Sequence, residues 1–189
     1  LFLISTGNNS IYEYNTLNKK EYAKSGRKIK LSVAHVYGRE NFKGGTTFAY
    51  KGEIKRYHEW THVKCSYNEY FKLNKHYIIG LYSEMVGSNK RLFTNYISSV
   101  LGANSFEPIV EMRTSFIPIY RNYSYYSLGL INVIPFNNLL DIRVSGYYYQ
   151  PYKEILKRNN YVYYGNKFAS NYYIFSGGLV LHTHFFPVS

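Results

Sequence analysis

The sequence predicts an all-β fold: an antiparallel, up-and-down transmembrane β-barrel, of which the chain is an incomplete fragment of about seven strands. Apolar and polar residues alternate with the period of two that an extended chain requires. Tyr accounts for 24 of the 189 residues and aromatic residues for 20%, as is typical of strands and of aromatic belts at membrane interfaces. Short and long connections also alternate between the predicted strands, as they do in membrane barrels.

The clearest hairpin lies in residues 128–150. In its second half Leu140, Ile142 and Val144 fall on one face of an extended chain, whereas Asp141 and Arg143 fall on the other. The joint at residues 135–138, Pro-Phe-Asn-Asn, has turn chemistry because Pro fixes φ and Asn tolerates left-handed φ. One face of the hairpin is therefore apolar and the other is charged, and a membrane barrel would enclose the charged face.

In chain order, the predicted strands cover residues 11–17, 27–37, 56–71, 76–86, part of 115–134, 139–150 and 171–184. Residues 95–101 could form a short helical turn inside the longest connection. The connections after the second, fourth and sixth strands run to about a dozen residues or more, and the others are short. All short turns then lie at one end, which favours a membrane barrel over a soluble barrel that buries its apolar face inward.

Composition leaves several partners open. The formal charge of +12 predicts attraction to polyanions such as nucleic acid, anionic lipid headgroups or lipopolysaccharide. The mean hydropathy of −0.34 suits membrane strands, which average to neutral because only every second residue is apolar. We expect one domain over residues 1–189, and the start at Leu1, without Met or a signal peptide, predicts an internal piece of a longer protein.

The candidate site residues fall into two groups. A polar network inside the predicted barrel comprises Lys28, Lys30, Glu84, Asp141 and Arg143. An ion-pair network that fills a narrow interior is favoured over a permeation path, and for Asp141 and Arg143 an ion pair is expected. The basic residues of the predicted external loop 151–170 are Lys153, Lys157 and Arg158. They could contact lipopolysaccharide phosphates or simply be solvated.

No metal, cofactor or catalytic site is predicted. His58 and His62 share a strand face, as do His182 and His184, but no carboxylate or thiol lies beside them on the same face of either strand. The single cysteine, Cys65, excludes an intrachain disulfide and is expected to be a small apolar residue. The pair at residues 177–178, Gly-Gly, predicts a bulge or bend in a strand rather than a phosphate loop.

Several segments resemble a known family. Residues 11–33, IYEYNTLNKKEYAKSGRKIKLSV, resemble a periplasmic turn and the strand that follows it in the bacterial surface-antigen barrel superfamily. Residues 70–84, 90–108, 122–151 and 163–189, beginning YFKLNK, KRLFTN, NYSYYS and YYGNKF, resemble the carboxy-terminal outer-membrane β-barrel of bacterial patatin-like phospholipases. The resemblance covers nearly the whole chain and rests mainly on the order of these short motifs.

The resemblance implies a Gram-negative outer-membrane protein. Its parent would carry an amino-terminal patatin-type serine hydrolase, a periplasmic linker and a barrel with more strands than are predicted here. The implied partners are membrane lipid, the hydrolase domain of the same chain and the barrel assembly machinery. The family's Gly-X-Ser-X-Gly elbow is missing, and the only Asp, Asp141, is followed by Ile142 rather than Gly or Ala, so no catalytic residue carries over and the chain itself is expected to be no enzyme.

Function therefore has several candidates. The first is the barrel module of a phospholipase, which would anchor or translocate the hydrolase. The second is an outer-membrane channel, transport or assembly barrel without an enzyme. A soluble, basic nucleic-acid-binding β domain is the third, although the chain has no RNA-binding signature and its aromatic residues do not form one platform. A barrel phospholipase with Ser and His inside its strands is a fourth.

Overall fold

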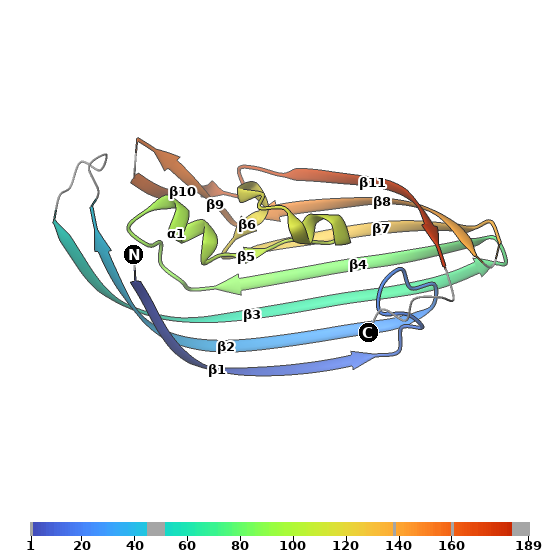
Figure 1. The fold of residues 1–189 in the computed structure, drawn as a ribbon, viewed down its shortest axis with the longest axis horizontal. Coiled ribbons are helices and arrows are strands. Elements are labelled where there is room, and N and C mark those ends of the chain that lie inside the picture. The colour runs from blue at the N-terminus through green and yellow to red at the C-terminus, as the bar shows by residue number, and fades with distance from the viewer. Residues whose placement is uncertain (1, 45–51, 138, 160, 183–189) are drawn as a thin grey trace.

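One large antiparallel sheet dominates the fold (Figure 1). The computed structural model describes residues 2–44, 52–137, 139–159 and 161–182. The strands of the sheet, in spatial order, are β1 (Phe2–Asn15), β2 (Gly26–Lys43), β3 (Glu53–Asn74), β4 (Tyr77–Ser88), β7 (Tyr125–Pro135), β8 (Leu140–Pro151) and β11 (Tyr172–Leu181). Each strand pairs with the next large strand along the chain, so the sheet is an up-and-down meander.

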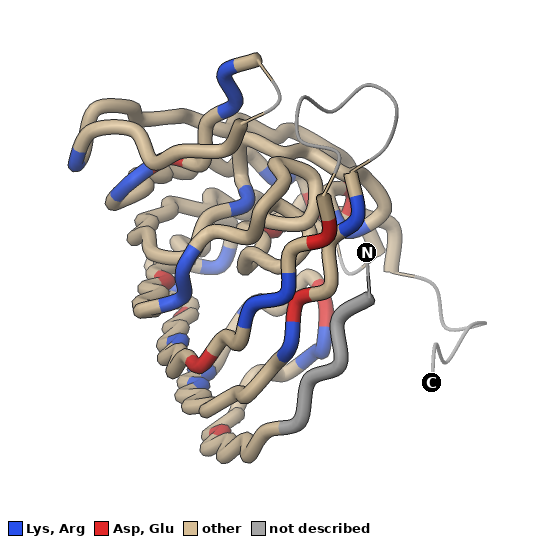
Figure 2. The backbone as a smooth tube through the Cα atoms, turned by 90° about the vertical axis from the view of Figure 1, so that its left-hand side faces the viewer, with Lys and Arg blue, Asp and Glu red and all other residues tan. Residues whose placement is uncertain are grey.

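The seven-stranded antiparallel sheet confirms the all-β prediction. Within the described ranges, β1 pairs only with β2 and β11 only with β8, so this sheet is open and no closed barrel is seen. Figure 2 looks nearly along the strands and shows the sheet bent around a concave side. None of the helices in the described ranges is long and apolar enough to cross a membrane.

The concave side is covered by the connection between β4 and β7, residues 89–124, which we call the inner segment. It contains α1 (Tyr96–Leu101), the two-stranded pair of β5 (Asn104–Ser105) and β6 (Arg121–Asn122), and the 3-10 helices η1 (Val110–Thr114) and η2 (Pro118–Tyr120). The Asn95 side chain caps α1 by accepting from the Ser98 amide at 2.7 Å, as Asn at an N-cap does. The helical turn predicted at residues 95–101 is thereby confirmed.

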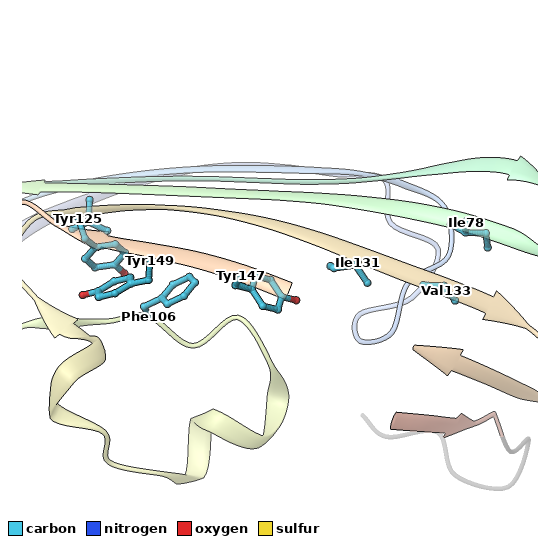
Figure 3. Close-up of a cluster of buried hydrophobic side chains, with 8 residues drawn as sticks. Ile78, Phe106, Tyr125, Ile131, Val133, Tyr147 and Tyr149 are labelled. Atoms are coloured by element: carbon cyan, nitrogen blue, oxygen red, sulfur yellow. The ribbon is translucent and has the colours of Figure 1, made fainter. Parts of the chain in front are cut away.

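The core lies between the inner segment and the concave face (Figure 3). Phe106, which is fully buried, stacks on Tyr149 of β8 with ring centroids 5.0 Å apart. Tyr125 and Tyr147 lie at 6.0 and 6.4 Å from the same ring with edge-on geometry, an arrangement that aromatic quadrupoles favour. The Tyr125 hydroxyl donates to Glu84 at 2.6 Å, and the Tyr149 hydroxyl accepts from the Asn122 amide at 2.9 Å, so these rings fill the concavity while their hydroxyls reach polar partners.

Glycines make room for these rings. A Cβ at Gly129 of β7 would collide with the ring of Tyr147, and one at Gly80 of β4 would lie 2.6 Å from the ring of Tyr70. Both glycines point to the concave side, where cross-strand neighbours carry large aromatic side chains. They therefore serve close packing inside the sheet.

Three connections differ from the prediction. The β2–β3 connection is predicted to be long, but β2 and β3 pair as far as Lys43 and Glu53 and thereby shorten it. The β1–β2 connection, residues 16–25, is predicted to be short and is the longer of the two. The predicted loop 151–170 contains a hairpin of β9 (Lys153–Arg158) and β10 (Tyr161–Lys167). The cations of this segment suggested a loop, although the alternation through Val162 and Tyr164 is that of a strand.

Candidate functional site

The convex face of the sheet is apolar and exposed. On β8, Ile142 and Val144 are exposed, whereas the residues between and beside them are buried. On β4 and β7 the exposed apolar residues likewise stand between buried or half-buried ones. The large apolar residues exposed on this face include Leu31, Val33, Val63, Phe71, Leu81, Met85, Leu128, Leu130, Ile134, Ile142, Val144, Phe175, Leu179 and Leu181. A soluble protein rarely exposes so large a continuous apolar surface.

Charged side chains bound this apolar band on β2 and β3. At one end Arg27 pairs with Glu69 at 2.6 Å, and at the other the His35 Nε2 lies 3.3 Å from a Glu59 carboxylate oxygen. At roughly 3.3 Å per residue, the path along β3 from Glu59 to Glu69 is about 33 Å. A strand of this length would rise about 25 Å if it were tilted by about 40°, the tilt and the band height that are typical of outer-membrane barrels.

A row of tyrosines crosses the convex face near one end of β7, β8 and β11. The rings of Tyr126 and Tyr148 have centroids 5.8 Å apart, and those of Tyr148 and Tyr173 are 5.4 Å apart. Each strand contributes one ring, so the row runs across the strands. Such rows of amphipathic rings are typical of a membrane interface.

The concave face carries the charges, and Asp141 is the centre of one cluster. Its fully buried carboxylate forms an ion pair with the Lys24 ammonium group at 2.6 Å and lies 2.5 Å from the His182 Nε2. Lys19 reaches the other ring nitrogen of His182 at 2.8 Å. Because an ammonium group only donates, this contact assigns the imidazole proton to Nε2, which donates to Asp141. The β1–β2 connection is thus tied to the far side of the sheet.

Arg143 is close by in sequence but has other partners. Its Nη2 donates to the backbone carbonyls of Tyr22 and Ala23 at 2.5 and 2.8 Å, and the guanidinium lies 5.4 Å from the centre of the Tyr22 ring. The ion pair expected between Asp141 and Arg143 is not formed. Asp141 and Arg143 share a strand face because they are two residues apart. The β1–β2 connection folds inward, however, and supplies Lys24 to Asp141 and backbone carbonyls to Arg143.

The other predicted interior residues also lie on the concave side, in separate clusters. Glu84 accepts from Tyr125 at 2.6 Å and from Tyr82 at 2.8 Å, and Lys64 lies 3.0 Å from it. Lys28 and Lys30 share the carboxylate of Glu13, at 2.8 and 3.9 Å. The five predicted residues therefore belong to several small networks.

Sequence reasoning missed the partners Lys19, Lys24, Glu13 and Lys64. Glu13 and Lys64 lie on the inward parity of their strands, so the alternation rule could have found them. Lys19 and Lys24 lie in a connection, and nothing in local sequence signals that it folds inward.

Another cluster, around Lys90, holds the inner segment at the opposite end of the sheet. The Lys90 ammonium group lies 4.2 Å from the centre of the Trp60 ring and 4.6 Å from that of Phe93, and it donates to the Gly102 carbonyl at 2.8 Å. Burial lowers the pKa of Lys90 to about 8. Beside it, the buried Glu40 carboxylate pairs with His58 at 2.9 Å and accepts from the Thr94 amide at 2.7 Å.

A cavity of about 680 Å³ remains between the β1–β2 connection, residues 107–113 and the concave face. Its lining includes Lys28, Glu111, Arg113 and Arg143. Glu111 accepts from the Tyr22 hydroxyl at 3.4 Å, and Arg113 pairs with Glu21 at 2.8 Å. Burial and the Glu111 charge raise the pKa of Tyr22. The β1–β2 connection and the inner segment thus meet across this cavity.

The residues of the predicted external basic loop lie in the β9–β10 hairpin. Lys157 and Arg158 are exposed at its tip, and Lys153 is half-buried at its base. None of the three forms an ion pair with a residue in the described ranges.

Histidines and the cysteine have ordinary surroundings in the described ranges. His58 pairs with Glu40 and His182 with Asp141, while His184 lies outside the described residues. Across these ranges no group of three His, Cys, Asp or Glu side chains could hold a metal ion. Cys65 is free and exposed on the convex face. No protein-family model, curated protein or solved structure matches this chain.

Proposed function

We propose that the chain is part of an outer-membrane β-barrel, with the convex face against lipid hydrocarbon and the concave face as the barrel interior. The observation that carries this proposal is the inverted burial of alternate residues: apolar side chains are exposed and charged side chains are buried. Lipid hydrocarbon would surround the exposed apolar side chains, and the internal networks supply hydrogen-bonding and ion-pair partners for the buried charged side chains. In this proposal, further strands pair with the free edges of β1 and β11.

The occupied interior favours an anchor over an open channel. The inner segment packs its own core against β7 and β8, and the β1–β2 connection is tied to Asp141 and Arg143. These contacts lie where a water-filled pore would run. The proposed role is therefore to hold an attached domain at the membrane.

The attached domain is proposed from the sequence resemblance alone. A patatin-type hydrolase would need a Ser activated by a carboxylate partner and backbone donors for the oxyanion. Asp141 pairs with Lys24 and His182, so its role in this proposal is structural. Lipid acyl hydrolysis would depend on a Ser outside residues 1–189.

A channel is the second candidate, and the charged cavity of about 680 Å³ is the observation that favours it. Release of the β1–β2 connection would widen that cavity toward one mouth.

The two candidates are separated by reconstitution in lipid vesicles and planar bilayers. The anchor proposal predicts insertion, shown by protease protection and flotation with vesicles, together with negligible steady conductance. A large, steady conductance in the unmodified protein would favour the channel. Failure to float with uncharged vesicles would contradict both.

A hydrolysis assay on the same preparation tests the attached domain. Residues 1–189 alone should not hydrolyse phospholipid, and in a longer protein that carries the hydrolase Asp141→Asn and His182→Ala should leave hydrolysis unchanged. Loss of turnover in these variants, with insertion retained, would instead place the chemistry inside the barrel.

A further inference from the structure

The β9–β10 hairpin concentrates positive charge at one end of the sheet. It carries Lys153, Lys157, Arg158 and Lys167, and none of them forms an ion pair within the described ranges. Its carboxylate, Glu154, is engaged elsewhere, since it accepts from Ser170 and from Tyr172, both at 2.7 Å. The cations therefore lack a neutralising partner in the described part of the chain.

Two of these cations lie opposite each other. Lys153 and Lys167 are paired positions of the antiparallel hairpin, and the ammonium groups of both lie 5.8 Å from the centre of the Tyr152 ring. Lys153 also lies 5.7 Å from the ring centre of Tyr164. Like charges directly opposite in a sheet repel each other. An anion between them would remove that repulsion.

The backbone around this pair is held in place. The Tyr152 amide donates to the Ser124 carbonyl and the Phe168 amide to the Tyr152 carbonyl, both at 2.9 Å. The Tyr164 hydroxyl donates to the Lys90 carbonyl at 2.8 Å, and Ile155 is buried against the inner segment. The two lysines are thus displayed by a fixed hairpin base.

The position of the pair selects the anion. Tyr152 follows Tyr148, a member of the convex tyrosine row, by four residues of nearly continuous strand, or about 13 Å. If the row marks the edge of the hydrocarbon, the lysines lie at headgroup level. Phe168 is exposed and packs on Tyr152 with ring centroids 5.2 Å apart, which places an apolar surface beside the cations.

We propose that Lys153, Lys167 and Tyr152 bind the phosphate group of a membrane lipid headgroup. Two ammonium groups supply the donors, and the aromatic surface of Tyr152 and Phe168 meets the first carbons of the lipid. This inference rests on the proposed function, because it uses the membrane position of the tyrosine row.

The test uses the protein in a phosphate-free, uncharged detergent, titrated with dihexanoyl phosphatidic acid, a dihexanoyl lipid with a carboxylate headgroup, inorganic phosphate and a short single-stranded DNA. Lys153→Gln/Lys167→Gln is compared with Lys157→Gln/Arg158→Gln, which removes equal charge at the hairpin tip. We expect the first double variant to bind phosphatidic acid roughly 25-fold more weakly, about five-fold per lysine, and the tip variant to bind nearly as the unmodified protein does.

Thermal unfolding in the same detergent provides a second readout. Without phosphate, Lys167→Gln should unfold at the same or a higher temperature than the unmodified protein, because repulsion is relieved. Phosphatidic acid should raise the midpoint of the unmodified protein and leave that of Lys153→Gln/Lys167→Gln unchanged.

Several results would overturn the proposal. They are equal losses in the two double variants, equal affinity for the carboxylate lipid or for inorganic phosphate, and tighter binding of the DNA. Flotation with uncharged vesicles is scored separately, so failure of membrane insertion is distinguished from failure of the phosphate site.

Discussion

The two faces of β8 differ sharply in which side chains they expose. Val144 is 52% exposed, whereas Arg143 and Ser145, on either side of it in sequence, are 9% and 8% exposed. In a protein folded in water the exposures would be reversed, because apolar burial is the main favourable term. This inverted exposure is the observation on which the proposed lipid-facing role of the convex face rests.

The two faces of the sheet also differ in the partners of their side chains. On the concave face Asp141, Arg143 and Glu84 each have hydrogen-bonding partners from other segments. On the convex face of β4, β7, β8 and β11 there is no Lys, Arg, Asp or Glu in these strands. The charged side chains of the concave face thus have partners within the chain, whereas the exposed apolar side chains of the convex face contact the surroundings of the protein.

The largest expected effect comes from breaking an interior cluster. Asp141→Ala would leave Lys24 and His182 without their carboxylate, and loss of one member of a buried pair typically costs about 3–5 kcal/mol. Urea unfolding of the protein in lipid vesicles measures the change. Glu59→Ala removes a carboxylate that is 63% exposed in its side chain and should have little effect. Equal effects of the two changes would contradict the buried role of Asp141.

The second-largest effect is expected from a charged side chain placed on the convex face. Val144→Arg should cost roughly 2–4 kcal/mol near the bilayer midplane. Ser145→Arg, next to it but facing the cavity, should be much milder. Folding yield in vesicles is the readout for both. A mild effect of Val144→Arg and a severe one of Ser145→Arg would contradict the proposal that the convex face contacts lipid.

A smaller, pH-dependent effect is expected at Lys90. Burial lowers its folded-state pKa to about 8, below an unfolded value of about 10.4. Between these values the unfolded chain binds more protons than the folded chain, so the free energy of unfolding should rise by about 2 kcal/mol from pH 7 to pH 10. Urea unfolding at pH 7 to 10 tests this, with Lys90→Met as a variant that cannot titrate there. Parallel pH profiles would contradict it.

The sheet could be predicted from the sequence because its signal is local. Alternation in residues 27–37, 76–86 and 139–150 assigned both the strands and the faces, and it placed Lys28, Glu84 and Asp141 on the inward side. Strand ends were less predictable, since pairing rather than composition extends β2 to Lys43 and begins β3 at Glu53.

The contents of the concavity could not be predicted. The contacts of Lys24 with Asp141 and of Phe106 with Tyr149 join segments far apart in sequence. Such contacts depend on how a connection folds back over a finished sheet, and no periodic pattern records this. The hairpin at Lys153 was missed as a strand because its cations resemble a solvated loop.

The native cysteine offers the most direct test of the convex face as a lipid-facing surface. Cys65 lies within the apolar band of β3, between Glu59 and Glu69, and Ser66 beside it faces the interior. A spin label on Cys65, and one on Ser66→Cys with Cys65→Ser, can be compared in lipid vesicles for collisions with oxygen, which concentrates in hydrocarbon, and with a water-soluble nickel chelate. The account predicts that the Cys65 label collides readily with oxygen and is shielded from nickel, and that the position 66 label lacks this oxygen preference. A Cys65 label as accessible to nickel as one on the turn residue Lys75 would contradict it.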